Sequence, residues 1–323
     1  MGERILVTGA SGQIGRHLVR ALVAEGHEVT GLTRSDVGAS WIQEDGAKAI
    51  RGNLLDPEAV ARATAGAERI FHLAGGVRGH GKNTPEVINV QTTAVLLNAL
   101  RDASELKSLV LASSSAVYGD RAWLWVEEDF KPSPNTLYGA AKLKAEELVL
   151  EACEAGTPGI IARIGAVYDR TFNFSQVERM QQGKAWLPGE GLNTVPVIHV
   201  EDCVRALLHL AHAGETGEIY HVADRSSPNL GEFYNAIHKY TGGSPVVFWS
   251  TWIPSYVQTY GARLNEWCQT RAGTRPRFTP DNLKLYTNSL RLKTDKLAAL
   301  GFDWNYPEYQ AGIAAAFSID GNS

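Results

Sequence analysis

Short β-branched and apolar runs alternate with helical patterns along the first half of this chain, which restricts the possible folds more than any other feature. The expected strands are Ile5–Val7, Glu28–Leu32, Ala47–Ile50, Arg69–Leu73, Ser108–Ala112 and Gly159–Ala162. The expected helices are Gln13–Glu25, Pro57–Ala63, Pro85–Asp102 and Thr136–Glu154. Right-handed crossovers make such strands parallel, with helices on both faces. The alternation predicts an α/β fold with a doubly wound parallel (Rossmann) sheet.

The second half of the chain follows a looser pattern. We expect Val195–His199 and Glu218–Val222 to return to the main sheet as strands, with the helix Glu201–Ala213 between them. A chain of 323 residues exceeds what one small core needs. We therefore predict a cofactor-binding domain of residues 1–164 and 194–224. Residues 165–193 and 225–323 would form a smaller substrate-binding domain over the carboxyl ends of the strands, where such sheets bind ligands.

The segment TGASGQIG places three glycines between the first strand and the first helix. Such a segment is either a plain tight turn or a place where a large anion touches the backbone. Here Gly9 permits the turn, Gly12 lets a pyrophosphate approach, and Gly15 lets the helix pack closely. The helix N-terminus adds free N–H groups and the positive end of its dipole. This context favours a dinucleotide site.

The end of the second strand indicates which dinucleotide is bound. An NAD site would place Asp or Glu near Thr33 to hold both ribose hydroxyls, but the chain reads Thr33, Arg34, Ser35. A guanidinium pairs with a 2′-phosphate that a carboxylate would repel. We predict NADP(H) rather than NAD, although Arg34 could be a plain surface arginine and Asp36 stands close by. Asn53 and Leu54 are expected at the adenine, and Phe71–Gly76 beneath the phosphates and ribose.

One tyrosine of eleven, Tyr138, has a lysine four residues later, Lys142, within a clearly helical segment. Both side chains then project from one face, and an ammonium near a phenol lowers the pKa of the phenol. Ser114, at the end of the fifth strand, would reach the same cleft. We predict that Ser114 binds the substrate oxygen, that Tyr138 transfers the proton, and that Lys142 tunes Tyr138 and holds the nicotinamide ribose.

Composition limits the function in several ways. The net charge is −4 and no basic cluster is present, so we expect a small-molecule substrate and no nucleic acid. Three separated cysteines, Cys153, Cys203 and Cys268, form no metal pattern and fit a reducing compartment. No apolar run is long enough to span a bilayer, and no leader precedes the first strand. We expect a cytoplasmic protein with no metal site and no membrane span.

The chain resembles the extended short-chain dehydrogenase/reductases of the NAD-dependent epimerase/dehydratase superfamily. The matching segments are TGASGQIG, GNLLDPEAV, FHLAGG, INVQTTAVLLNAL, SSSAVYG, YGAAK, ARIGAVYD, VIHVEDCVRALL and KLAALGFDW. The resemblance implies a homodimer through the helices Pro85–Asp102 and Thr136–Glu154, catalysis by Ser114, Tyr138 and Lys142, and a supporting role for Asn89. The expected cofactor-binding residues are Gly9, Ser11, Gly12, Gln13, Ile14, Gly15, Thr33, Arg34, Asn53, Leu54, Leu73, Ala74, Gly75, Asn89, Tyr138, Lys142 and Ile164.

Departures from the family's patterns narrow the chemistry that the resemblance implies. Dehydratases of this superfamily carry Asp-Glu after the catalytic hydroxyl, where this chain has Ser115 and Ala116. Epimerases commonly carry an arginine that grips the diphosphate where this chain has Val195, which cannot pair a phosphate. The segment from Arg275 to Phe302 is instead similar to steroid dehydrogenase-like and dihydroflavonol reductase-like members.

The resulting hypothesis is an NADP(H)-dependent oxidoreductase that interconverts a hydroxyl and a ketone on a fairly apolar small molecule. The alternative is a sugar-nucleotide epimerase or ketosugar reductase with the same triad and Arg163 or Arg170 near the diphosphate. A cofactor-binding sensor without catalysis is a third hypothesis, which the intact triad disfavours. The aromatic stretch Val246–Tyr260, with Trp267, fits a core helix, an apolar lid or a membrane contact. His80 and Lys82 are further candidates for substrate contact.

Overall fold

The computed structural model describes residues 2–77, 84–122, 124–171, 174–249, 255–271 and 279–318. Its centre is a seven-stranded sheet in the order β3-β2-β1-β4-β5-β7-β11, in which every pairing is parallel. The strands are β1 (Arg4–Thr8), β2 (Glu28–Thr33), β3 (Lys48–Arg51), β4 (Arg69–His72), β5 (Ser108–Ser114), β7 (Gly159–Ile164) and β11 (Ile219–Val222). The strand order reverses between β1 and β4, which is where sheets of this class bind ligands.

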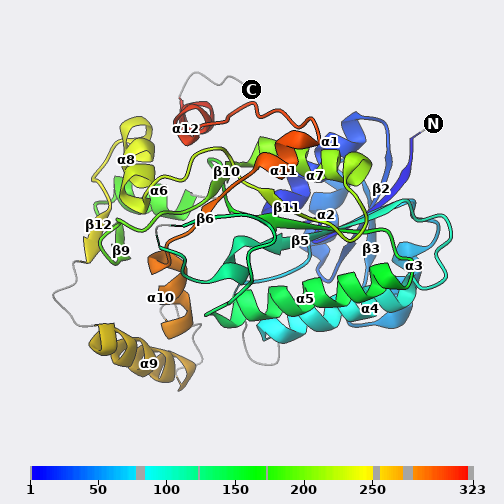
Figure 1. The fold of residues 1–323 in the computed structure, drawn as a ribbon, viewed down its shortest axis with the longest axis horizontal. Coiled ribbons are helices and arrows are strands. Elements are labelled where there is room, and N and C mark those ends of the chain that lie inside the picture. The colour runs from blue at the N-terminus through cyan, green and yellow to red at the C-terminus, as the bar shows by residue number, and fades with distance from the viewer. Residues whose placement is uncertain are drawn as a thin grey trace.

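Helices cover both faces of this sheet (Figure 1). Helices α1 (Gln13–Ala24) and α7 (Val200–Ala213) pack on one face around apolar residues such as Leu18 and Leu207, both fully buried. The other face carries α3 (Pro57–Thr64), η1 (Glu86–Gln91), α4 (Thr92–Ala99) and α5 (Leu137–Glu154). Near-continuous apolar strands such as Leu109–Ala112 are what a sheet buried on both faces requires. The predicted doubly wound sheet is therefore confirmed.

One predicted strand was placed wrongly. β10 (Val197–His199) does not join the main sheet but pairs in parallel with β8 (Ala166–Tyr168). The edge of β7 is already occupied by β11, and beyond Gly165 the chain pairs with β10 through a hydrogen bond from Ala166 N to Pro196 O (2.7 Å). Sequence reasoning also missed α2 (Asp36–Glu44), whose first turn is capped by the Ser35 hydroxyl.

The second part of the chain contributes a separate apolar cluster, which includes Phe233, Ile237 and Ile313. The helices and strands of this second part of the chain lie to one side of the main sheet in Figure 1. They are α6 (Phe174–Gln181), β9 (Trp186–Pro188), α8 (Leu230–Thr241), β12 (Val247–Trp249), α9 (Ser255–Arg271), α10 (Pro280–Thr287) and α12 (Tyr309–Phe317). β9 pairs with β12, and β6 (Trp125–Val126) pairs with β13 (Arg291–Leu292).

The C-terminal segment also returns to the large sheet. Helix α11 (Asp295–Ala299) and the residues after it insert Leu297, Phe302 and Trp304 into the core cluster that contains the first strands. The Trp304 indole N–H donates to the Ala223 carbonyl at 2.9 Å. The large core is therefore built from both ends of the described chain.

Candidate active site

The turn between β1 and α1 brings backbone amides to the carboxyl edge of the sheet. Gly9 has a φ of +72°, a region that glycine adopts without strain, and its carbonyl accepts from Gly12 N at 2.8 Å. A side chain on Gly15 would overlap the same carbonyl oxygen. Within the part of the chain that the structure describes, no side chain caps α1, so its first N–H groups are free to bind an anion.

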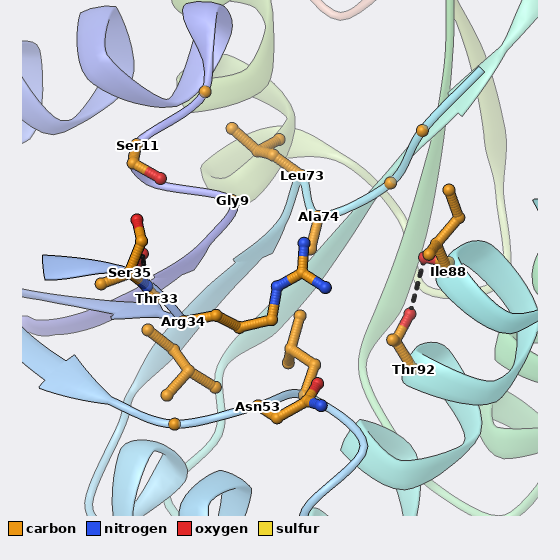
Figure 2. A pocket seen from close by; sticks show the side chains of 16 residues that line it. Gly9, Ser11, Thr33, Arg34, Ser35, Asn53, Leu73, Ala74, Ile88 and Thr92 are labelled. Atoms are coloured by element: carbon orange, nitrogen blue, oxygen red, sulfur yellow. Dashed lines mark hydrogen bonds between the residues drawn. The ribbon is translucent and has the colours of Figure 1, made fainter. Parts of the chain in front are cut away.

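A pocket of about 670 Å³ opens above this turn (Figure 2). Residues that follow β1, β2 and β4 line it, so it lies at the reversal of the strand order. The predicted cofactor residues in its lining are Gly9, Ser11, Gly12, Thr33, Arg34, Asn53, Leu54, Leu73, Ala74 and Gly75. Gly76, the last residue of the segment expected beneath the phosphates, also lines it, and the lining residues that sequence reasoning missed are Leu32, Ser35, Gly52, Ile88 and Thr92. The available signal was Gly52, directly before the predicted residue Asn53.

The other predicted cofactor residues lie outside the pocket lining. Gln13 donates to the Thr171 carbonyl at 3.3 Å, and Ile14 packs against the large core. Gly15 lies under the turn, where a side chain would overlap Gly9. Ile164 is buried at the end of β7. These residues support the turn or the sheet rather than line the cavity.

The end of β2 places a cation in the pocket. The Arg34 side chain is exposed and extends into the cavity, and it makes no hydrogen bond or ion pair with any described residue (Figure 2). Asp36, the carboxylate that put this interpretation in doubt, forms an ion pair with Arg51. The Ser35 hydroxyl is engaged as the cap of α2, where it accepts from Gly38 N at 3.0 Å. An anion entering here would meet a guanidinium that no described carboxylate neutralises.

Asn89 lies in η1, a π-helical turn, and is 1% exposed. Its amide nitrogen donates to the carbonyls of Gly76 (3.1 Å) and Pro85 (2.7 Å), and its amide oxygen accepts from Gly76 N (3.3 Å). The side chain thus fixes the loop after β4 instead of pointing into the cavity. The structure places Asn89 as a support for the pocket wall.

The three predicted catalytic residues come together beside the pocket. Tyr138 is half-buried and lies close enough to Ser114 for the serine hydroxyl to lower its pKa, and the Lys142 nitrogen lies 5.9 Å from the centroid of the Tyr138 ring. The Lys142 ammonium donates to the Ala112 carbonyl at 2.8 Å. A Cβ on Gly75 would lie 2.8 Å from Lys142 Nζ, so the lysine reaches the pocket at Gly75.

The prediction of an acidified tyrosine was wrong in direction. Burial raises the pKa of Tyr138 above 10, and the hydrogen bond from Ser114 offsets this only in part. The Lys142 nitrogen points to the Ala112 carbonyl and lies over the tyrosine ring, so it does little for the phenolate. Burial also lowers the pKa of Lys142 from 10.5 to about 8, against the attraction of Glu146.

The N-terminus of α5 is held by α10. Asp281 Oδ1 accepts from Leu137 N at 2.7 Å, and Lys284 donates to the Asn135 carbonyl at 2.7 Å. The Asn135 and Asn288 amides exchange two hydrogen bonds, of 3.1 and 2.9 Å. Sequence reasoning missed these contacts because they join residues about 150 positions apart. They fix the turn that presents Tyr138.

Two other predictions about basic residues have different outcomes. Arg163 cannot serve a diphosphate, because its guanidinium is 2% exposed and pairs with Glu146 at 2.7 Å. Arg170 is exposed after β8 and remains available. His80 and Lys82 lie outside the described residues.

The aromatic stretch divides into two elements. Val247–Trp249 is the strand β12, not a helix, and Val246 is buried in the smaller core. Tyr260 and Trp267 are exposed on α9. Among the described helices none has the length and apolar character needed to cross a bilayer.

Comparisons with known proteins place this site in a family. The sequence model of the NAD dependent epimerase/dehydratase family matches residues 5–223. The chain is 32% identical over 238 residues to a 4-hydroxy-2-methyl-3-oxo-4-farnesyl-3,4-dihydroquinoline-1-oxide ketoreductase of Stigmatella aurantiaca, with 71% of each chain covered. It is 32% identical over 217 residues to a 2-alkyl-3-oxoalkanoate reductase of Stenotrophomonas maltophilia, with 63% of each chain covered.

The fold is also similar to solved structures. The UDP-glucuronic acid 4-epimerase of Bacillus cereus, in complex with UDP-glucuronic acid and NAD, superposes with a TM-score of 0.77. The two share 22% identity, and the alignment covers 97% of this chain and 98% of that one. At this identity the likeness concerns the fold. The glycine turn, the pocket at the strand reversal and the match over residues 5–223 together show that the chain is an enzyme of the NAD dependent epimerase/dehydratase family, with the extended short-chain dehydrogenase/reductase fold.

Proposed function

We propose that the protein is an NADP(H)-dependent oxidoreductase that interconverts a hydroxyl and a ketone on a fairly apolar small molecule. The observation that carries the proposal is the position of Lys142. Its ammonium reaches Gly75 in the wall of the dinucleotide pocket, and it lies on the same helix face as Tyr138, which lies beside Ser114. The groups that would activate the substrate therefore lie next to the wall of the cofactor pocket.

The residues present fit a nicotinamide dinucleotide. The uncapped start of α1 and the glycine turn suit its pyrophosphate, and residues such as Asn53 and Leu54 border the far end of the cavity. When bound, the nicotinamide gives or accepts the hydride. The pocket residues would bind and orient this group, and Lys142 would meet it at Gly75.

The chain's own residues handle the proton. Tyr138 would donate its hydroxyl proton to a carbonyl oxygen, or remove the proton of an alcohol, while Ser114 hydrogen-bonds that oxygen. The raised pKa of Tyr138 keeps the proton on the phenol at neutral pH, which suits the direction of ketone reduction. Lys142 keeps N–H donors beyond the one given to Ala112, and these would hold the ribose.

Arg34 supports NADP(H) over NAD. Its guanidinium extends into the pocket without a partner among the described residues, and the neighbouring carboxylate of Asp36 is paired with Arg51. A 2′-phosphate there would gain a charge-assisted contact and meet no free carboxylate.

Two observations favour a ketone on an apolar molecule over a sugar nucleotide. The two relatives at 32% identity are named as a ketoreductase and a 3-oxoalkanoate reductase. Val195 packs against the smaller apolar core, and Arg163 is buried in its ion pair, so neither can bind a diphosphate.

We propose that residues 165–193 and 225–323 bind the substrate, and that η1, α4 and α5 form a homodimer interface.

The test is Tyr138→Phe together with the wild-type enzyme. NADPH and a panel of 3-oxoalkanoates and prenylated ketones are supplied, and cofactor absorbance is followed. We expect wild-type turnover and near-complete loss in Tyr138→Phe, with NADPH binding kept. Full activity in the variant would refute the mechanism. Turnover of a UDP-sugar with tightly bound NAD, and none of any ketone, would favour the epimerase alternative.

A further inference from the structure

A buried ion pair lies one helical turn beyond Lys142. Glu146 is 1% exposed, and Arg163 binds its carboxylate through Nε (3.1 and 3.2 Å) and Nη2 (2.7 Å). The Ser113 hydroxyl donates to Glu146 Oε1 as a further partner. Nothing in the proton transfer proposed above uses this pair, although burying two charges is unfavourable unless they are closely matched.

Arg163 makes further buried hydrogen bonds beyond the ion pair. Arg163 Nη1 donates to the Tyr118 hydroxyl at 2.6 Å and to the Glu128 carbonyl at 3.1 Å. The Tyr118 hydroxyl in turn contacts His221 Nε2 at 2.6 Å. Arg163 therefore cannot turn toward another anion without breaking several buried hydrogen bonds.

The geometry joins three elements at the reaction site. Glu146 belongs to α5, which carries Tyr138 and Lys142. Ser113 directly precedes Ser114 on β5, and Arg163 lies opposite Ser113 in the parallel register of β5 and β7. Because one carboxylate contacts both strands, it sets the separation between the helix that carries the phenol and the strand end that carries the serine hydroxyl.

The negative charge of the same carboxylate also attracts the Lys142 ammonium and raises the pKa of Lys142. Lys142 is 4% exposed, and Ala112 is its one hydrogen-bond acceptor among the described residues. The other described groups around Lys142 give no negative charge: Tyr138 on its own helix has a raised pKa, and His72 on β4 is neutral, with a pKa of about 3. Arg163 on β7 is cationic. Among the described residues, Glu146 is the anion that stabilises this ammonium.

We propose that Glu146 is a positioning residue: fixed by Arg163 and Ser113, its carboxylate keeps the Lys142 ammonium charged and holds α5 against the strand end that carries Ser114. The inference rests on the proposed function in taking Lys142 as the residue that holds the cofactor ribose. Glu146 touches neither substrate nor cofactor and acts through Lys142.

The test is Glu146→Gln in the full chain, with Glu147→Gln as its matched control. Glu147 is the next residue of α5 and is exposed, so its replacement has the same chemistry without the buried contacts. NADPH affinity is measured by fluorescence across pH. It should fall at alkaline pH as Lys142 loses its proton, and we call this fall the alkaline limb. Lys142→Met, which has no ammonium, identifies the limb that Lys142 produces. Glu146→Gln leaves the Arg163 cation unbalanced near Lys142, so we expect its limb to move to lower pH by at least about one unit. The limb of Glu147→Gln should stay in place.

A conservative variant and a paired variant complete the test. Glu146→Asp keeps the charge and should restore the wild-type limb, while turnover stays reduced because the shorter side chain changes the helix position. If Glu146→Gln fails to fold, Glu146→Gln with Arg163→Met removes both charges. In this paired variant Lys142 has lost the attraction of Glu146 but also the repulsion of Arg163. We then expect the pH at which NADPH binding weakens to lie below that of wild type, but by less than one unit.

Different results overturn the inference and the proposed function. A folded variant without the Glu146 charge whose limb matches wild type would overturn the inference. A limb that persists in Lys142→Met would do the same. A wild-type protein that binds NADPH with this limb but reduces no ketone would overturn the proposed function and leave the role of Glu146 standing.

Discussion

Replacing Arg34 by alanine should separate the two nicotinamide dinucleotides. Arg34 extends into the pocket and has no partner among the described residues, so its removal breaks no internal contact. Any change in binding must then come from the ligand. We expect weaker binding of NADPH and unchanged binding of NADH, which lacks the 2′-phosphate.

The size of this effect follows from the exposure of the side chain. A hydrogen bond to a charged partner contributes about 1.5–3 kcal/mol. Arg34 is exposed, and solvent screens its attraction for the phosphate, which places the contribution in the lower half of that range. About 1.5–2 kcal/mol corresponds to a loss in NADPH affinity of about 10- to 30-fold.

Fluorescence titration of both cofactors measures the effect directly. Arg62→Ala is the matched control, because Arg62 is an exposed arginine on α3 outside the pocket lining. Its NADPH affinity should stay within about twofold of wild type. Equal losses for NADPH and NADH in Arg34→Ala, or no loss for either, would refute the assignment of Arg34 to the 2′-phosphate.

Three further predictions concern the charge of Lys142, the glycine turn and the core. The Lys142 pKa of about 8 means that the ammonium is lost as pH rises through that value, so kcat/KM for the cofactor should fall on the alkaline side. Between about pH 8 and 10.5 Lys142 is protonated in the unfolded state but not in the folded state, so the free energy of unfolding should rise with pH. Urea denaturation of the cofactor-free protein, compared with Lys142→Met, measures this rise. In Gly15→Ala the new methyl group would overlap the Gly9 carbonyl, and we expect a loss of about 1–3 kcal/mol in denaturation with weaker cofactor binding by titration. Leu18→Ala, at a fully buried position, should lower the free energy of unfolding by about 2–5 kcal/mol while the cofactor affinity of the folded protein is kept.

The parallel sheet could be predicted because its signals are local. Each central strand is a short apolar run, and the glycine turn links the first strand to the first helix within eight residues. The pairing of β10 with β8 could not be predicted, because it depends on which strand edge β11 leaves open. The helix Asp36–Glu44 was missed because its sequence, DVGASWIQE, contains a glycine and only a short apolar face.

The candidate site shows the same division. The spacing of Tyr138 and Lys142 on one helix was sufficient to predict their shared face. The direction of the Tyr138 pKa was not predictable, since it depends on burial and on where the Lys142 nitrogen points. The pair Glu146–Arg163 required the register of β5 and β7, which a single sequence does not contain.

The insertion of Leu297, Phe302 and Trp304 into the first core has a consequence for synthesis on the ribosome. The strands that form this core emerge early, but three of its apolar side chains emerge only after nearly three hundred residues have been translated. Until then the nascent sheet keeps apolar surface open to water, and such partly folded chains aggregate readily. Completion of the large core is therefore a late event, for which chaperone protection of the growing chain is favourable.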